Sequence, residues 1–159
     1  MNVAGLLDRA RRAGVMIATA ESCTGGLVAA SITDIPGSSD VFERGFVTYS
    51  DIAKTGLLGV DAGIIARHGA VSQQVAKAMA EGAIRNSEAQ LAVSTTGIAG
   101  PGGTDRKPEG MVCFGLASVN ADTFAETRRF GAVGRESVRA ASVEHALNLL
   151  DSRIAELLK

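Results

Sequence analysis

The sequence contains no tryptophan, one tyrosine and two cysteines among its 159 residues. Without Trp, the core has to be filled by Ala, Val, Ile and Leu, which favours helices packed closely against a sheet. Two cysteines, Cys23 and Cys113, are too few for a disulfide framework. Together with the two histidines they also lack the spacing of zinc ligands, so we expect no bound metal.

The sequence also has neither an excess of one sign of charge nor a long apolar run. The 16 basic residues are balanced by 17 acidic ones, whereas a nucleic-acid-binding surface requires clustered Lys and Arg. No segment approaches the ~20 apolar residues of a membrane span. Charges at Asp8, Arg9, Arg11 and Arg12 interrupt the beginning of the chain before a signal-peptide core could form. We therefore expect a cytoplasmic protein that binds neither nucleic acid nor membranes.

Glycine, in contrast, is abundant. It occupies 19 positions, roughly 12% of the chain against a usual ~7%. There is no linker, internal repeat or low-complexity segment, and the length suits one hydrophobic core. The sequence therefore predicts a single domain that spans residues 1–159.

Hydrophobic spacing alternates between the helical and the strand period along the chain. Helices are predicted over Val3–Ala13, Gly26–Ile32, Asp51–Leu58, Gly63–Arg67, the segment from Ser72 to Ala83, and Arg135–Leu158. Strands are predicted over Val15–Ala20, Gly45–Tyr49, Leu91–Thr96, Met111–Val119 and Thr123–Phe130. This order predicts an α/β fold, a single three-layer α/β/α domain with a mixed sheet of about five strands, the later ones antiparallel.

The first candidate site is the segment Glu21-Ser22-Cys23-Thr24-Gly25-Gly26, between a predicted strand and a predicted helix. Ligands of α/β sheets gather beyond the carboxyl ends of strands, and backbone N–H groups at such a turn can bind an oxyanion. Gly25 and Gly26 would let a substrate approach the backbone closely. Spacing alone does not choose a nucleophile among Ser22, Cys23 and Thr24, and an ordinary helix cap with a glycine turn is the alternative.

The second candidate is Lys54, one turn into a predicted helix and on the face of Leu57 and Leu58. Desolvation disfavours the charged form of a lysine, so a buried Lys54 could serve as the base that activates a serine. The alternative is a side chain that extends along the apolar face to solvent. Spacing alone favours this alternative.

A glycine-rich segment and two arginines complete the candidates. Thr95–Gly103 has four glycines within seven residues after a predicted strand, which suits either a backbone nest for an anion or a flexible turn. Counting back from Val143 by fours along the last helix gives Arg139 and Arg135. Arginines on an inward-facing line need a partner, either a substrate phosphate or carboxylate or a structural salt bridge, for example with Glu21.

Four segments taken together resemble the CinA C-terminal domain family. They are AESCTGG (20–26), FERGFVTYSDIAK (42–54), HGAVS (68–72) and TTGIAGPGG (95–103). The similarity covers essentially the whole chain, and the segments follow the order of the family. Within the family, the chain is most similar to the members that stand alone as nicotinamide mononucleotide (NMN) amidohydrolases.

The resemblance implies hydrolysis of the NMN carboxamide to nicotinate mononucleotide and ammonia, without a cofactor, by a protein that commonly forms homodimers. It implies that Ser22 is the nucleophile and Lys54 its general base, with Tyr49 relaying a proton or orienting Lys54. The substrate-binding positions implied by the resemblance and by the turn are Thr24, Gly25, Gly26, Thr96, Gly97, Gly100 and Arg139. Two alternatives stay open: a non-catalytic, competence-associated nucleotide-binding module, and an amidase for another pyridine carboxamide.

Overall fold

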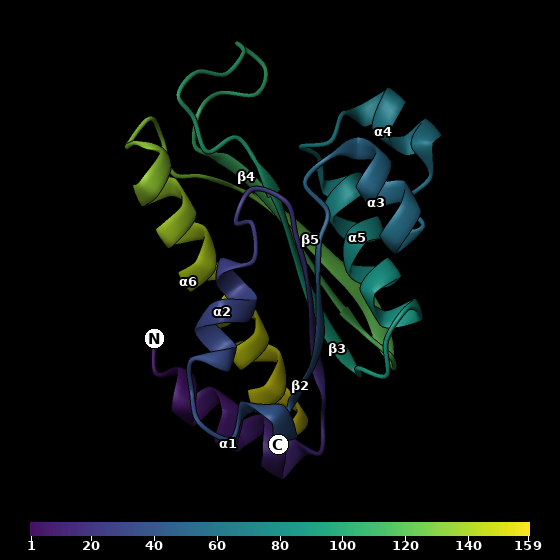
Figure 1. The fold of residues 1–159 in the computed structure, drawn as a ribbon, viewed down its shortest axis with the longest axis vertical. Helices are drawn as coiled ribbons and strands as arrows, with labels where there is room; N and C mark the ends of the chain where they lie inside the picture. The colour runs from purple at the N-terminus through teal and green to yellow at the C-terminus, as the bar shows by residue number, and fades with distance from the viewer.

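A five-stranded sheet lies at the centre of the computed structural model, which describes all residues 1–159 (Figure 1). The strands are β1 (Ile17–Glu21), β2 (Phe42–Val47), β3 (Leu91–Gly97), β4 (Met111–Ser118) and β5 (Ala121–Arg129). Their order in the sheet is β2-β1-β3-β4-β5. Strand β1, which is second from one edge, pairs in parallel with β2 and β3, whereas β4 is antiparallel to β3 and β5. The predicted mixed sheet is confirmed.

Helices cover both faces of the sheet and enclose two apolar clusters (Figure 1). One face carries α1 (Val3–Ala13), α2 (Leu27–Thr33) and α6 (Arg135–Leu157). The other face carries α3 (Asp51–Leu58), α4 (Ala62–His68) and α5 (Gln73–Arg85). None of these helices combines the length and the apolar character needed to cross a membrane.

The strand residues that face α5 are small. Ile17 and Val93 point into the cluster under α1, α2 and α6, whereas Ala18, Ala20 and Ala92 point toward α5. Small side chains on this face let the helix approach the sheet closely, which accounts for a core built without Trp. The long helix α6 is also tied to α1, because Arg9 donates two hydrogen bonds to Asp151, at 2.8 and 2.5 Å.

The edge strand β2 differs from its prediction. It begins at Phe42 and ends at Val47, so Tyr49 lies in the following loop and not at the strand's end. Two polar residues, Glu43 and Arg44, obscured the first half of the strand, because an edge strand exposes side chains that a central strand would bury. The other strands differ from prediction by only one or two residues at either end.

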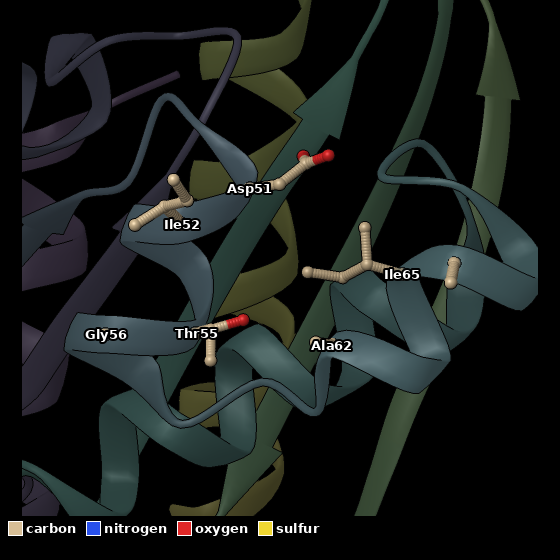
Figure 2. A pocket seen from close by; sticks show the side chains of 7 residues that line it. Asp51, Ile52, Thr55, Gly56, Ala62 and Ile65 are labelled. Atoms are coloured by element: carbon tan, nitrogen blue, oxygen red, sulfur yellow. The ribbon is translucent and has the colours of Figure 1, made fainter.

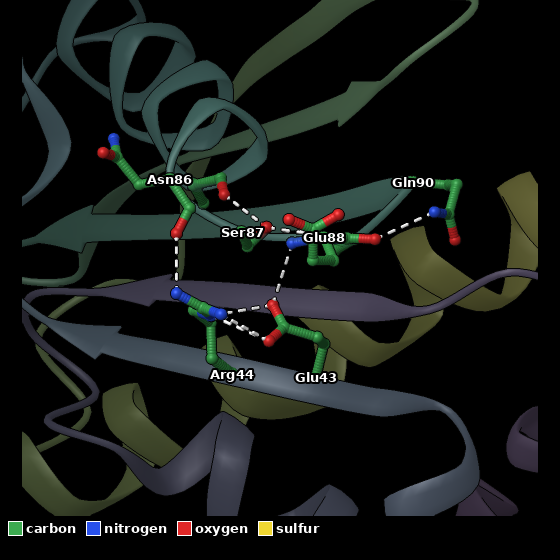
Figure 3. Close-up of polar contacts among 8 residues, drawn as sticks. Glu43, Arg44, Asn86, Ser87, Glu88 and Gln90 are labelled. Atoms are coloured by element: carbon green, nitrogen blue, oxygen red, sulfur yellow. Dashed lines mark hydrogen bonds and ion pairs between the residues drawn. The ribbon is translucent and has the colours of Figure 1, made fainter.

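The same two polar residues fix β2 against the turn that precedes β3 (Figure 3). Arg44 donates to the carbonyl of Asn86 (3.1 Å) and pairs with Glu43 (2.7 Å), whose carboxylate accepts from the backbone N–H of Glu88 (3.0 Å). Exposed ion pairs contribute only ~0–1 kcal/mol each. The network therefore joins the beginning of β2 to this turn and adds little to the stability of the domain.

The close approach of helix α3 to the neighbouring helix α5 depends on a glycine of α5. A Cβ atom added at Gly82 would lie 2.1 Å from the carbonyl oxygen of Leu58, whereas one added at Gly56 of α3 would meet nothing within 4 Å. We expect Gly82→Ala to lower the free energy of unfolding by about 1–3 kcal/mol through overpacking.

The matched control is Gly56→Ala, which we expect to raise the free energy of unfolding by about 0.5–1 kcal/mol because alanine is the better helix former. Urea unfolding of both variants measures the two effects. Equal effects of the two substitutions would contradict the close approach of α3 and α5.

Candidate active site

A cleft of about 220 Å³ opens beyond the carboxyl ends of β1 and β3. Seven of the residues singled out from the sequence line it, namely Ser22, Cys23, Tyr49, Lys54, Thr96, Gly97 and Arg135. Asp51 lines it as well, whereas the predicted positions Thr24, Gly25, Gly26, Gly100 and Arg139 do not. Residues more than 100 positions apart in the chain therefore meet at one edge of the sheet.

Ser22 and Lys54 are in contact inside this cleft. Lys54 Nζ lies 3.1 Å from Ser22 Oγ, and the two side chains are 1% and 8% exposed. The alternative in which Lys54 extends to solvent is therefore wrong. Its neighbour Leu58 is buried, but Leu57 is half exposed, so Lys54 belongs to the inner side of α3 together with Leu58 alone.

The surroundings of Lys54 favour the neutral amine. Burial lowers the pKa of the amine, and the carboxylate of Asp51, 4.0 Å away, opposes this shift only in part. The Nζ atom also lies 3.2 Å from the carbonyl oxygen of Thr48 and 3.5 Å from that of Tyr49. A neutral amine has two N–H bonds and one lone pair. With the N–H bonds directed at the two carbonyls, the lone pair can accept the proton of Ser22.

The other two nucleophile candidates have different surroundings. Burial raises the pKa of the Cys23 thiol to about 12, so the thiol stays protonated at neutral pH. Thr24 is fully buried, and its hydroxyl is hydrogen-bonded to Glu21 (2.6 Å) and to Thr95 (2.8 Å). Of the three, Ser22 alone contacts Lys54 through its side chain.

Two glycines shape the turn after Ser22. Gly25 and Gly26 have φ angles of +59° and +104°, which other residues rarely adopt. The N–H of Gly25 donates to the carbonyl of Ser22 (3.0 Å) and is not free to bind a ligand. The N–H groups of Cys23, Thr24 and Gly26 have no partner within the protein, and of these three residues only Cys23 lines the cleft.

The glycine-rich segment is hydrogen-bonded to a neighbouring part of the chain at Ile98, whose N–H donates to Met111 and whose carbonyl accepts from Gly110. Gly97 and Ala99 line the cleft, whereas Gly100 contributes a carbonyl that accepts from Arg135 (2.6 Å). Thr96 donates its hydroxyl proton to the carbonyl of Ala70 (2.8 Å), which leaves it an acceptor toward the cleft.

The two arginines of α6 have separate partners. Arg139 is half-buried and donates to the carbonyls of Cys23 (3.1 Å) and Thr24 (3.3 Å), not to the carboxylate of Glu21. Arg135 is exposed at the cleft and donates to Gly100 and to the hydroxyl of Tyr49 (2.9 Å). The Tyr49 hydroxyl is thus engaged by Arg135, and only the backbone carbonyl of Tyr49 reaches Lys54.

Sequence reasoning missed two contributors to the site. Asp51 lies three positions before Lys54 on the same helix, and this spacing could have indicated a charge next to the amine. Thr48 acts through its backbone carbonyl, which every residue type has, so no sequence signal could have found it.

A second, larger hollow lies between α3 and α4 (Figure 2). It measures about 550 Å³ and is lined mainly by apolar or small residues, which are Asp51, Ile52, Thr55, Gly56, Ala62, Ile65 and Ala66. It shares only Asp51 with the cleft and contains neither Ser22 nor Lys54. The smaller cleft is therefore the candidate active site. Nowhere in the structure do three or more His, Cys, Asp or Glu side chains gather so that they could hold a metal ion.

Known proteins with the same fold and sequence pattern include several solved structures. A competence/damage inducible protein, CihA, from Agrobacterium tumefaciens is 42% identical and superposes with a TM-score of 0.90 over 100% of this chain and 97% of its own. A CinA superfamily protein from Escherichia coli is 33% identical, with a TM-score of 0.89 over 94% of this chain and 87% of its own.

Curated relatives are longer than this chain. A CinA-like protein from Chloroherpeton thalassium is 51% identical over 141 residues, which are 86% of this chain and 33% of the relative. The chain thus spans about a third of the length of the curated relatives it matches. The profile of the CinA C-terminal domain matches residues 3–154. The resemblance found in the four sequence segments is confirmed, and the chain belongs to the CinA C-terminal domain family.

Proposed function

We propose that the protein hydrolyses the carboxamide of NMN to nicotinate mononucleotide and ammonia, with Ser22 as nucleophile and Lys54 as general base. The observation that carries this proposal is the buried contact of 3.1 Å between Lys54 Nζ and Ser22 Oγ. A non-catalytic nucleotide-binding module would have no use for an amine of lowered pKa against a serine hydroxyl. The amidase therefore explains a feature that the binding module leaves unexplained.

The reaction begins when Lys54 removes the proton of Ser22 and Oγ attacks the carboxamide carbon. The positively charged pyridinium ring withdraws electrons from that carbon and so favours the attack. Collapse of the tetrahedral intermediate breaks the C–N bond, and Lys54 returns its proton to the leaving ammonia. The ester on Ser22 is then hydrolysed by a water molecule that Lys54 deprotonates, which releases the carboxylate and restores the serine.

Stabilisation of the oxyanion is assigned to the backbone of the turn. Among the unpaired N–H groups of the turn, that of Cys23 belongs to a residue that lines the cleft and is the assigned donor, whereas the N–H of Gly25 and the hydroxyl proton of Thr96 are already used within the protein. Loss of one such donor typically costs ~10²–10³ in turnover. This interaction is therefore a large part of the proposed catalysis.

The size and charge of the cleft suit the pyridine end of the substrate. Its volume of about 220 Å³ is below the ~300–1,000 Å³ of sites that enclose a whole drug-sized ligand. The pyridinium carboxamide would therefore enter while the ribose phosphate stays at the mouth. Asp51 is the anionic group of the lining and Arg135 the exposed cation. We assign the phosphate to Arg135, because Arg135 is exposed and lines the cleft, whereas Arg139 does not line it.

Ser22→Ala and Lys54→Met should each abolish ammonia release from NMN, because one removes the nucleophile and the other its base. Cys23→Ser should keep activity, since the thiol is protonated and the hydrogen bond of Lys54 is with Ser22. Lys77→Met, on the exposed side of α5, is the matched lysine control. An ammonia assay with NMN, nicotinamide riboside and NAD measures the activity of all four variants.

Ammonia release by Ser22→Ala at the normal rate would refute the assignment of Ser22 as the nucleophile. No release by the unmodified protein would favour the binding module.

The dependence of kcat/KM on pH should report the amine of Lys54. Only the neutral amine accepts a proton, so the rate should rise with pH through a pKa below that of an ordinary lysine. The carboxylate of Asp51 raises this pKa, so Asp51→Asn should lower it further and move the rising limb toward lower pH. Asp122→Asn removes the same charge from β5, outside the cleft, and should leave the limb in place. A limb that moves equally in both variants, or toward higher pH in Asp51→Asn, would contradict the role of Lys54.

Arg135→Gln should raise the KM for NMN by about 10- to 100-fold, the usual effect of a lost charge-assisted hydrogen bond. The same change should leave kcat/KM for nicotinamide riboside, which has no phosphate, almost unchanged. Arg128→Gln, an exposed arginine of β5, is the matched control. Steady-state kinetics on both substrates give the comparison. An equal loss of kcat/KM for the riboside would show that Arg135 does not bind the phosphate.

A further inference from the structure

Helix α2 begins without a cap of its own. The residue at its N-cap is Gly26, which has no side chain to accept a hydrogen bond. The first N–H groups of a helix lack partners within the helix and require other acceptors. Here the N–H groups of Val28 and Ala29 donate to the two carboxylate oxygens of Glu21, at 2.8 and 3.1 Å. A remote carboxylate therefore replaces the usual cap.

The same carboxylate also holds the turn that follows Ser22. Thr24 donates its hydroxyl proton to Glu21 Oε1 (2.6 Å), so the contact of 2.8 Å between Thr24 and Thr95 is one in which Thr95 donates. Glu21, Thr24 and Thr95 are all buried, with Glu21 only 1% exposed. A buried carboxylate is tolerated when several donors satisfy it. Glu21 therefore joins the end of β1, the turn and the beginning of α2 through one group.

We infer that Glu21 is a positioning residue for the reaction, fixing Ser22 and the free N–H groups of the turn relative to each other. It precedes Ser22 directly in the chain and does not line the cleft. Arg139 holds the same turn through the carbonyls of Cys23 and Thr24, so the turn is restrained on its side-chain and its backbone groups. This inference rests on the proposed function, because it assumes that Ser22 attacks a carbonyl.

Positioning of this kind should affect turnover more than binding. A displacement of ~1 Å in a reacting group costs about 10²-fold in rate, whereas the groups at the mouth of the cleft that bind substrate would not move. A cap that served stability alone would lower the unfolding temperature and leave kcat unchanged well below that temperature. The two roles therefore differ in the measured kcat.

The test uses Glu21→Gln, Thr24→Val and Thr19→Val. Glu21→Gln keeps the shape but turns one acceptor into a donor. Thr24→Val leaves the carboxylate in place and removes the hydroxyl that links it to the turn, together with the contact of that hydroxyl with Thr95. Thr19→Val is the matched control, since Thr19 lies on the same strand, is fully buried and has a hydroxyl with no partner. Thr24→Val keeps the test meaningful if Glu21→Gln does not fold.

Two reactions are followed at a temperature well below that of unfolding. The first is the hydrolysis of NMN, which gives kcat and KM. The second is the modification of Ser22 by phenylmethylsulfonyl fluoride, whose rate is followed by intact mass, with Ser22→Ala as the blank. In this reaction the Oγ–S bond forms, the S–F bond breaks, fluoride leaves and Lys54 takes the serine proton. It requires a positioned Ser22 but no NMN activity.

We expect kcat and the sulfonylation rate to fall about 10- to 100-fold in Glu21→Gln and about tenfold in Thr24→Val, with KM within about twofold. Thr19→Val should match the unmodified protein. A normal kcat and a normal sulfonylation rate in both variants would overturn the inference. If the unmodified protein is sulfonylated but releases no ammonia from NMN, the proposed function fails, and the sulfonylation rates alone decide the role of Glu21. If it does neither, both proposals fail.

Discussion

The arrangement of the site depends on one buried amine, that of Lys54. Removing an amine from water disfavours its charged form, and the carbonyls of Thr48 and Tyr49 provide the acceptors it would otherwise find in solvent. Those carbonyls lie in the loop after β2, which is held to β1 because the N–H of Thr48 donates to the carbonyl of Glu21 (2.8 Å). The amine itself is carried by α3, whose distance from α5 is set at Gly82. A loop bonded to β1 and a packed glycine thus both act on the position of Lys54.

The charges around the cleft follow an order that suits the proposed substrate. Burial lowers the pKa of the Lys54 amine and raises that of the Cys23 thiol, so it disfavours the charged form of both groups. Asp51 supplies a negative charge and Arg135 a positive one, and both residues line the cleft and are exposed. NMN carries a pyridinium cation and a phosphate anion, and a ligand with these two charges in the opposite order would meet like charges at both positions.

Much of the fold can be predicted from local sequence patterns, whereas the arrangement of the candidate site can be predicted only in part. Periodicity and caps such as Ser50, whose hydroxyl accepts from the N–H of Ala53, suffice for the element order. The edge strand β2 was misplaced because its exposed polar residues break the alternation. Spacing cannot tell whether a long side chain such as Lys54 turns inward, since that depends on elements distant in sequence. The partners of Arg139 are backbone carbonyls, which leave no trace in the sequence, and the choice of Ser22 came from the resemblance to the family.

Helix α6 connects the mouth of the cleft to the far end of the domain. Its first turns carry Arg135 and Arg139. Asp151 lies about 24 Å from Arg135 along the helix axis, at 1.5 Å per residue, and is hydrogen-bonded to Arg9 of α1. If the helix pivots at this anchored end, the displacement grows along its length and is largest at Arg135. The contact between α1 and α6 thus helps to hold the mouth of the cleft in register, although it lies at the opposite end of α6.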